Sequence, residues 1–223
     1  LSRIRGVGSM FAEVKLYEGL TFKTQTGIDY QERLRESYTK PGSILASYVG
    51  DAKTDDYTQT YQYVWTNTLN YTKTFNDLHE FNVLVGSEYN KYFQYFLTVS
   101  GSGMPSDKLS TLDNAASIDN GGSRKNEWAL MSYFGMLSYN FNQKYFLDGS
   151  IRRDGSSRFG ANNRYGTFWA VGAGWNLHEE SFIKSLPFIS RLQLRASIGT
   201  SGNMDIGNYE SLGLYVFDSY GGQ

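Results

Sequence analysis

The sequence has no cysteine, only 3 prolines and only 2 histidines among its 223 residues. The lack of cysteine excludes a disulfide framework and metal sites that depend on thiolate ligands. His79 and His178 each lie in or beside a predicted strand, far from any serine and acid with the spacing of a catalytic triad. We therefore expect no enzymatic activity, no metal site and no cofactor.

Long apolar runs and an excess of charge of one sign are also missing. A transmembrane helix needs about 18 or more consecutive apolar residues, and polar or charged residues interrupt every such window here. The 21 basic and 22 acidic residues leave a net charge of -1, which provides no basic field for a phosphate backbone. The sequence thus excludes helical membrane spanning and argues against nucleic-acid binding.

Aromatic residues and alternating patterns are abundant instead. Aromatic residues make up 16% of the chain, although the mean hydropathy is only -0.46. In a transmembrane β-strand, lipid-facing and lumen-facing side chains alternate, so the average hydropathy stays low. Period-2 alternation predicts about eight strands, of which the fifth has apolar residues on both faces and an open facing. The predicted strands span residues 10–16, 20–31, 61–72, 81–96, 128–141, 145–152, 169–177 and 192–199.

The connections between these strands alternate between short and long. The short ones are Glu18-Gly19, Asn76-Asp77 and Asn142-Gln143. The long ones cover roughly 39–57, 100–126 and 155–166, and the link 180–190 is a longer exception on the short side. Outer-membrane barrels have short periplasmic turns and long extracellular loops. We therefore predict an all-β antiparallel meander of about eight long transmembrane strands in a larger outer-membrane barrel.

The alternation also predicts which side chains face the lumen and which face lipid. An arginine on the lipid side would cost about 2–4 kcal/mol at the bilayer midplane, so charged strand residues belong in the lumen. The residues expected to face the lumen are Glu88, Asp148, Arg152 and Arg195. The residues expected to face lipid are Trp169, Val171, Trp175, Leu177, Leu192, Leu194 and Ile198.

Two groups of candidate substrate contacts lie in or beside the predicted outer loops. Tyr48, Tyr57 and Trp128 are aromatic rings that could stack on sugars, although ordinary loop packing explains them equally well. Arg153, Asp154 and Arg158 carry opposite charges, so they could pair and brace an outer loop, or contact the substrate directly.

Two long strings carry a resemblance to a known family. Residues 152–183 read RRDGSSRFGANNRYGTFWAVGAGWNLHEESFI, and residues 192–215 read LQLRASIGTSGNMDIGNYESLGLY. Both resemble the late barrel of SusC/RagA-type TonB-dependent outer-membrane transporters, with the DGSSRFG loop, the Gly/Trp strand and the LRAS-G-GN strand. The segment YFGMLSYNFNQKYFLDGSIR also looks like this family, so the resemblance extends over essentially the whole chain, residues 1–223.

The resemblance implies a function and several partners. Such a transporter imports a large nutrient, usually an oligosaccharide and sometimes a peptide, through a barrel of about 22 strands with a plugged lumen. A SusD-like surface lipoprotein caps the barrel, TonB supplies energy through the plug, and the wall contacts the lipid bilayer of the outer membrane of a Gram-negative bacterium. We expect the chain to be a C-terminal-half fragment of the barrel, without plug domain, TonB box or signal peptide.

Two other functions remain open at this point. A soluble β-rich glycan-binding module would bury the predicted lipid-facing residues between two sheets. A small autonomous outer-membrane barrel or adhesin is also possible, since eight strands suffice to close a narrow barrel. In that case, bulky arginine and tyrosine side chains would crowd the lumen.

Overall fold

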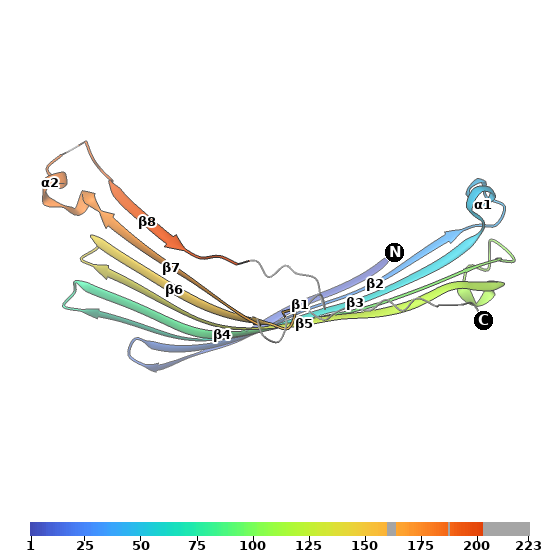
Figure 1. Cartoon of the computed structure of the whole chain (residues 1–223), viewed down its shortest axis with the longest axis horizontal. Coiled ribbons are helices and arrows are strands. Elements are labelled where there is room, and N and C mark those ends of the chain that lie inside the picture. Colours follow the sequence, from blue (N-terminus) through green and yellow to red (C-terminus); the bar gives the residue numbers. More distant parts are fainter. Residues whose placement is uncertain (160–163, 187, 203–223) are drawn as a thin grey trace. The chain divides into compact units, whose positions relative to one another are not determined.

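The computed structural model of the chain describes residues 1–159, 164–186 and 188–202. These residues form an 8-stranded sheet in which strands that are neighbours in the sequence are neighbours in the sheet (Figure 1). The all-β antiparallel meander predicted from the sequence is confirmed. Among the described residues, no helix has both the length and the apolar composition needed to cross a bilayer.

The strands differ greatly in length. The first five are long, and the last three, which include parts of the strings that carry the resemblance, are shorter. Short helical segments lie in the connections between strands. They include the 3-10 helices η1 (Leu112–Asn114) and η2 (Leu177–Glu179). The helices are α1 (Ile44–Val49) and α2 (Ser181–Lys184). The strands are β1 (Ser2–Tyr17), β2 (Leu20–Thr39), β3 (Ala52–Phe75), β4 (His79–Ser102), β5 (Ser117–Phe141), β6 (Tyr145–Ser156), β7 (Tyr165–Asn176) and β8 (Gln193–Gly199).

The chain divides into two compact units, which we call the short-turn unit and the long-strand unit. The short-turn unit consists of residues 10–26, 64–90 and 128–223, and contains the tight turns and all of β6, β7 and β8. The long-strand unit consists of residues 1–9, 27–63 and 91–127, and contains the far halves of β1 to β5 with α1 and η1.

The tight turns of the short-turn unit form where the sequence predicts them. Asn76 and Asp77 have φ of 51° and 57°, and Asn142 and Gln143 have φ of 51° and 55°. Two consecutive left-handed residues make a type I′ turn, whose twist matches the twist of the flanking strands. The turn is closed in each case by a backbone hydrogen bond, from Leu78 to Phe75 (3.1 Å) and from Lys144 to Phe141 (2.9 Å).

Gly19 in the first tight turn has two separate reasons to be glycine. Its φ is +78°, and a Cβ placed there would lie 2.2 Å from the carbonyl oxygen of Thr72. The close approach arises because the Thr72 amide donates a 2.9 Å hydrogen bond to the Gly19 carbonyl. Any larger residue would break this contact between the turn and β3.

The register of β5 to β8 sorts their side chains onto two faces, because directly opposed residues of antiparallel strands point the same way. Val171 is opposite Gly149 on β6 and Ile198 on β8. We call the face that Val171 shares the apolar face. Its side chains on these strands include Leu137, Tyr139, Phe141, Tyr145, Leu147, Ile151, Trp169, Trp175, Leu194 and Ile198.

The opposite face is the polar face. Its side chains on β5, β6 and β8 include Ser132, Phe134, Ser138, Asn140, Phe146, Asp148, Ser150, Arg152, Asp154, Gln193, Arg195 and Ser197.

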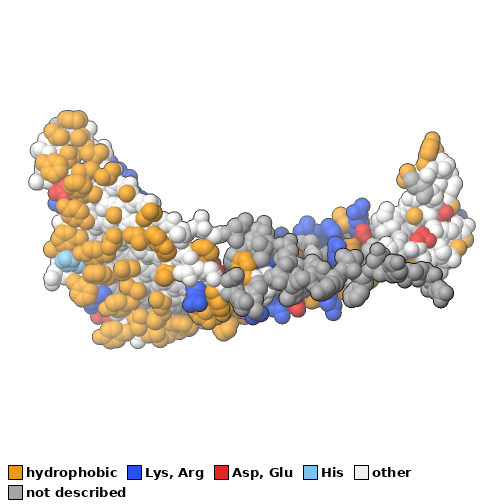
Figure 2. All heavy atoms as spheres, viewed as in Figure 1, with side chains coloured by type: hydrophobic (Ala, Val, Ile, Leu, Met, Phe, Trp, Pro, Cys, Tyr) orange, Lys and Arg blue, Asp and Glu red, His pale blue; other side chains and the backbone are white. Residues whose placement is uncertain are grey.

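Hydrophobic side chains cover much of the visible surface of the short-turn unit in Figure 2.

An aromatic row crosses the apolar face beside the tight turns. It consists of Phe141, Tyr145 and Trp175, whose rings stack in sequence with centroids 6.1 Å apart at each step. Phe81 and Tyr139 add a tilted pair with centroids 4.6 Å apart. Rings that collect at one height of a sheet are typical of an aromatic girdle at a membrane interface.

The side-chain contacts of the long-strand unit include several polar pairs. Arg5 donates hydrogen bonds of 3.1 and 2.7 Å to the two carboxylate oxygens of Asp29 on the neighbouring strand. Lys53 is only 4% exposed and pairs with Glu36 at 3.1 Å. Tyr61 stacks on Phe93 with ring centroids 4.9 Å apart. This part of the sheet therefore lacks the clear division between an apolar and a polar face.

Glu180 links the connection between β7 and β8 to the aromatic row. Its carboxylate accepts hydrogen bonds from Tyr145 Oη (2.8 Å), Trp175 Nε1 (3.2 Å) and Lys144 Nζ (3.2 Å). Glu180 lies between η2 and α2, outside the strands. The hydrogen bonds from Tyr145, Trp175 and Lys144 hold the pKa of the Glu180 carboxyl below its ordinary value.

The lowered pKa predicts a pH dependence for this connection. A carboxyl with a depressed pKa in the folded state stabilises the fold above its unfolded pKa, and the stabilisation is lost as the pH falls through the folded pKa. We expect the stability difference between the wild type and Glu180→Gln to be largest near pH 7 and to shrink below about pH 4. This stability difference is measured by urea unfolding of both proteins in detergent at several pH values. A difference that does not vary with pH would contradict the prediction.

Candidate functional site

The first part of the candidate site is a charged network on the polar face around Arg152. Its guanidinium donates hydrogen bonds to Asp154 Oδ1 (2.7 Å), Ser132 Oγ (2.9 Å) and Glu88 Oε1 (3.3 Å). Asp154 is 5% exposed and Ser132 is fully buried. We call Glu88, Ser132, Arg152 and Asp154 the arginine network.

Local geometry explains why the arginine network forms. Arg152 and Asp154 are two residues apart on β6, so they project from the same face of the sheet. Ser132 lies directly opposite Asp154 on β5, and Phe134 lies opposite Arg152. The Arg152 guanidinium also lies 5.6 Å from the centroid of the Phe134 ring, which provides a cation–π contact. Every charge of this network has a partner, and its hydrogen bonds connect β4, β5 and β6.

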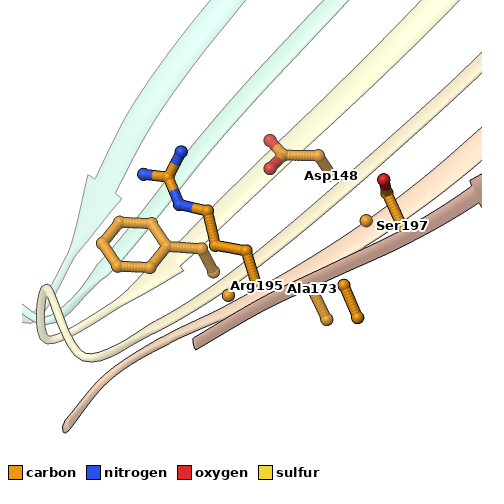
Figure 3. A pocket seen from close by; sticks show the side chains of 8 residues that line it. Asp148, Ala173, Arg195 and Ser197 are labelled. Atoms are coloured by element: carbon orange, nitrogen blue, oxygen red, sulfur yellow. The ribbon is translucent and has the colours of Figure 1, made fainter. Parts of the chain in front are cut away.

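The second part of the site is a hollow over β7, which we call the β7 trench. Its floor consists of Gly172 and Gly174, and its walls carry Phe146 and Asp148 from β6 and Arg195 and Ser197 from β8. The hollow has a volume of about 270 Å³. Figure 3 shows Asp148, Arg195 and Ser197 on one side of the ribbon and Ala173 on the other.

The β7 trench follows from the register. Gly172 lies between Asp148 and Ser197, and Gly174 lies between Phe146 and Arg195, in two successive rows. Because neither glycine has a side chain, each row has a gap of about two strand spacings, close to 10 Å, between its walls. The trench is therefore built into β7 itself and does not depend on a loop.

The charges of the β7 trench are available to a ligand. Among the described residues, Asp148 forms no hydrogen bond and no ion pair. The Arg195 guanidinium lies within hydrogen-bonding distance of the Gln193 side-chain oxygen, at 3.0 and 3.1 Å, when the Gln193 amide is oriented to accept. The trench thus offers an acid at one wall and a guanidinium at the other, over a floor of bare backbone.

A second hollow continues the trench across β6. It is lined by residues of β3, β4, β5 and β6, and it shares Phe146 and Asp148 with the trench. Asn140 Nδ2 donates a 2.7 Å hydrogen bond to Glu80 in this second hollow. In the parts of the chain that the structure describes, no group of three His, Cys, Asp or Glu side chains lies close enough to hold a metal ion.

The residues expected to face the lumen share one face. Asp148, Arg152 and Arg195 lie on the polar face by register, and Glu88 reaches this face through its bond to Arg152. The structure brings Glu88 and Arg152 into contact, and it places Asp148 and Arg195 at the two walls of the β7 trench. Their orientation toward a lumen stays a prediction.

The residues expected to face lipid divide into two sets. Those on strands β7 and β8 all lie on the apolar face, and they are Trp169, Val171, Trp175, Leu194 and Ile198. Leu177 begins η2, and Leu192 precedes β8, so neither belongs to a strand.

The expected substrate contacts fall in both units: Tyr48 and Tyr57 in the long-strand unit, and the others in the short-turn unit. Tyr48 lies on α1 and is 83% exposed. Tyr57 lies in β3 instead of a loop, and its ring meets Tyr95 edge to face at 6.4 Å. Trp128 lies in β5, where the Arg158 guanidinium is 4.9 Å from its ring centroid.

The charged residues of the DGSSRFG string are separated between the two faces. Asp154 pairs with Arg152, whereas Arg153 lies on the apolar face with its guanidinium 4.9 Å from the centroid of the Tyr165 ring. The bracing of Asp154 by Arg153 suggested by the sequence is wrong, because adjacent strand residues point to opposite faces. Gly160, Pro187 and Asn203, which belong to the recognised strings and the link before β8, lie outside the described residues.

Several residues of the site were not singled out in the sequence. Ser132 carries no signal of its own, because a serine within a mixed strand is common. Gly172 and Gly174 do carry one, since two glycines at alternate positions of a strand indicate that something approaches its backbone closely.

Comparison with known proteins gives consistent matches over nearly the whole chain. The family model described as TonB dependent receptor-like, beta-barrel, matches residues 11–220. A curated relative, TonB-dependent receptor P39 of Formosa agariphila, is 34% identical over 207 residues, which is 92% of this chain and 20% of the relative.

Structures of the RagAB transport system are among the solved structures of similar fold. The structure of the RagAB peptide transporter matches with a TM-score of 0.86 and 30% identity, over 97% of this chain and 26% of that chain. The RagAB peptide importer in the "closed-closed" state matches with a TM-score of 0.83 and 31% identity, over 93% of this chain and 24% of that chain. The chain therefore spans 20% of the curated relative and about a quarter of the solved chains.

Proposed function

Because the chain belongs to the TonB-dependent receptor-like β-barrel family, we propose that it forms part of the wall of an outer-membrane transporter that imports a large nutrient. In this proposal TonB supplies the energy through a plug domain, and a SusD-like surface lipoprotein caps the barrel. The lipoprotein partner is suggested by the SusC/RagA resemblance and by the match to RagAB structures.

The observation that carries the proposal is the exposure of the apolar face. Val171 is 44% exposed, Leu194 is 61% exposed and Ile198 is 69% exposed, although all are large apolar residues. Contiguous apolar surface of this kind marks a membrane or protein contact. A soluble two-sheet module would bury these side chains, so the exposure favours lipid as the covering layer.

The polar face supports the second half of the proposal. If the apolar face contacts lipid, the arginine network and the β7 trench face the interior of the barrel. The network braces this interior wall, and the trench offers charged groups to whatever passes or packs there. The chain thus contributes part of a transport path.

Two cargo classes are candidates. An oligosaccharide is the first, because it is the usual cargo of the family that the sequence resembles. A peptide is the second, because the matching solved structures are described as those of a peptide transporter. Neither the arginine network nor the β7 trench distinguishes them, since both classes accept hydrogen bonds and charge-assisted contacts.

Uptake measurements test the proposed function. The full-length protein is expressed in a Gram-negative host that lacks its own copy, and the cells are offered labelled oligosaccharides or labelled peptides. We expect uptake of one class that requires both this protein and an intact TonB system. Recovery of the protein in the soluble fraction, or uptake that persists without TonB, would overturn the proposal.

Two substitutions test whether the β7 trench belongs to the transport path. Asp148→Asn removes an unpaired charge, and Gly172→Gln fills the floor, where a Cβ meets only ordinary contacts of 3.6 Å and beyond. We expect each to lower uptake several-fold while the amount of folded protein in the membrane stays the same. The control is Gly149→Ala on the apolar face, where a Cβ meets nothing within 4 Å. Uptake at the wild-type rate in both trench variants would exclude the trench from the path.

A further inference from the structure

A cationic and aromatic cluster lies on the apolar face at the end remote from the tight turns. Arg153 is directly opposite Tyr133 on β5, and its guanidinium stacks over the Tyr165 ring at 4.9 Å. Tyr133 and Tyr165 are 53% and 57% exposed, and Arg153 is exposed as well. We call these three residues the outer cluster.

The distance between the outer cluster and the aromatic row matches the thickness of a membrane. From Tyr145 in the aromatic row to Arg153, β6 has nine residues, and a strand needs about 9–11 residues to cross the hydrocarbon at a tilt. At about 3.3 Å per residue and a tilt of about 40°, these residues cover roughly 20 Å of depth, close to the height of roughly 25 Å of an apolar band.

On the apolar face of β6, only apolar or absent side chains lie between these two levels. They are Leu147, Gly149 and Ile151, and their neighbours on β7 and β8 include Val171 and Ile198. When the aromatic row lies at one interface, the outer cluster therefore lies at the other. This places a guanidinium at the level of lipid headgroups, where long cationic side chains are stable.

The chemistry of the outer cluster suits a phosphate group. A guanidinium binds phosphate through two parallel hydrogen bonds, and a stacked ring restricts its orientation. Tyrosine hydroxyls at either side can donate further hydrogen bonds. Among the described residues, Arg153 forms no ion pair, whereas its neighbour Arg152 is neutralised by Asp154 and Glu88. Of these two neighbouring arginines, the one without an ion pair therefore lies on the apolar face.

We propose that Tyr133, Arg153 and Tyr165 bind the phosphorylated headgroup of a lipid in the outer leaflet of the membrane. The inference rests on the proposed function, because it needs the apolar face to contact lipid. It goes further by assigning a ligand class to an arginine that the sequence suggested as a substrate contact. The bound lipid would anchor the wall at a fixed depth.

Lipid binding by the full-length protein tests this assignment. The protein is purified in detergent and titrated with lipid A that carries its phosphates, with dephosphorylated lipid A and with inorganic phosphate, and the bound lipid is measured by native mass spectrometry. We expect Arg153→Gln to weaken binding of the phosphorylated lipid about tenfold, the loss of one charge-assisted contact. Arg153→Lys should recover part of the affinity, because the charge returns without the planar stack.

The matched control is Arg195→Gln, which removes the same charge from the polar face and should leave lipid affinity unchanged. Equal affinities for wild type, Arg153→Gln and Arg195→Gln would overturn the inference, and so would equal binding of phosphorylated and dephosphorylated lipid. Inorganic phosphate that binds as tightly as the lipid would indicate a free anion site and would also overturn it. If the protein does not assemble in the membrane at all, the proposed function fails instead.

Discussion

The Val171→Arg variant is expected to lose about 2–4 kcal/mol of folding free energy in a bilayer, so that folded protein becomes scarce in the membrane. Val171 lies in the row of Gly149 and Ile198, midway between the aromatic row and the outer cluster on β6. With lipid on the apolar face, a guanidinium at this depth lies away from water, and β5 to β8 place no acidic side chain beside it among the described residues. The cost is therefore close to its maximum for this wall.

The neighbouring residue provides a control for the Val171→Arg variant. Ala170 lies on the polar face, so Ala170→Arg adds the same side chain to the same strand on the other side of the sheet. We expect its folded fraction in a heat-modifiability gel to equal that of the wild type. Leu194→Arg should have an intermediate effect, because Leu194 lies opposite Trp175 at the level of the aromatic row. Equal damage from Val171→Arg and Ala170→Arg would contradict the assignment of the faces.

The second large effect is expected from the arginine network. Arg152→Ala leaves the carboxylate of Asp154, which is 5% exposed, without its guanidinium. Removing one partner of a buried ion pair typically costs about 3–5 kcal/mol. We expect a value near 3 kcal/mol here, at the lower end of about 3–5 kcal/mol, because the Arg152 side chain is 39% exposed.

The midpoint of urea unfolding in lipid vesicles measures this loss. Arg153→Ala is the control, since it removes the same charge from the next residue, and we expect it to change stability by less than about 1 kcal/mol. The double variant Arg152→Ala with Asp154→Ala should be more stable than Arg152→Ala alone, because the uncompensated carboxylate is gone. A double variant as unstable as the sum of both single changes would show that the pair does not interact.

The meander and its tight turns could be predicted from the sequence because their signals are local. Asn76, Asp77 and Asn142 tolerate the left-handed conformations of a type I′ turn, and Gln143 completes the second turn. Alternation on β6, β7 and β8 is clear because one face is uniformly apolar there. The turn and the alternation together also determine the register of each hairpin.

The ends of the long strands could not be predicted. β3 begins at Ala52 and β5 at Ser117, whereas the alternation suggested loops as far as about Tyr57 and Asn126. In the long-strand unit both faces carry polar and aromatic residues, as in the pairs Arg5–Asp29 and Lys53–Glu36. Without an apolar face the period of 2 disappears from the sequence, although the backbone pairing continues.

The ambiguous fifth strand also has a physical explanation. Phe134 lies on the polar face, where the alternation predicts a polar residue. Its ring lies over Gly86, where a Cβ would come within 2.5 Å of it, and beside the Arg152 guanidinium at 5.6 Å. The apolar residue thus belongs to the arginine network, and only the three-dimensional contact shows this.

The order of the strands has a consequence for how such a wall can change over evolution. Each strand has its sequence neighbours as its sheet neighbours, and no crossover joins distant parts of the described sheet. Duplication or loss of one hairpin would therefore add or remove two strands, and the ladders elsewhere would keep their partners. The circumference of the wall can change in such steps while both chain ends stay on their original side of the bilayer.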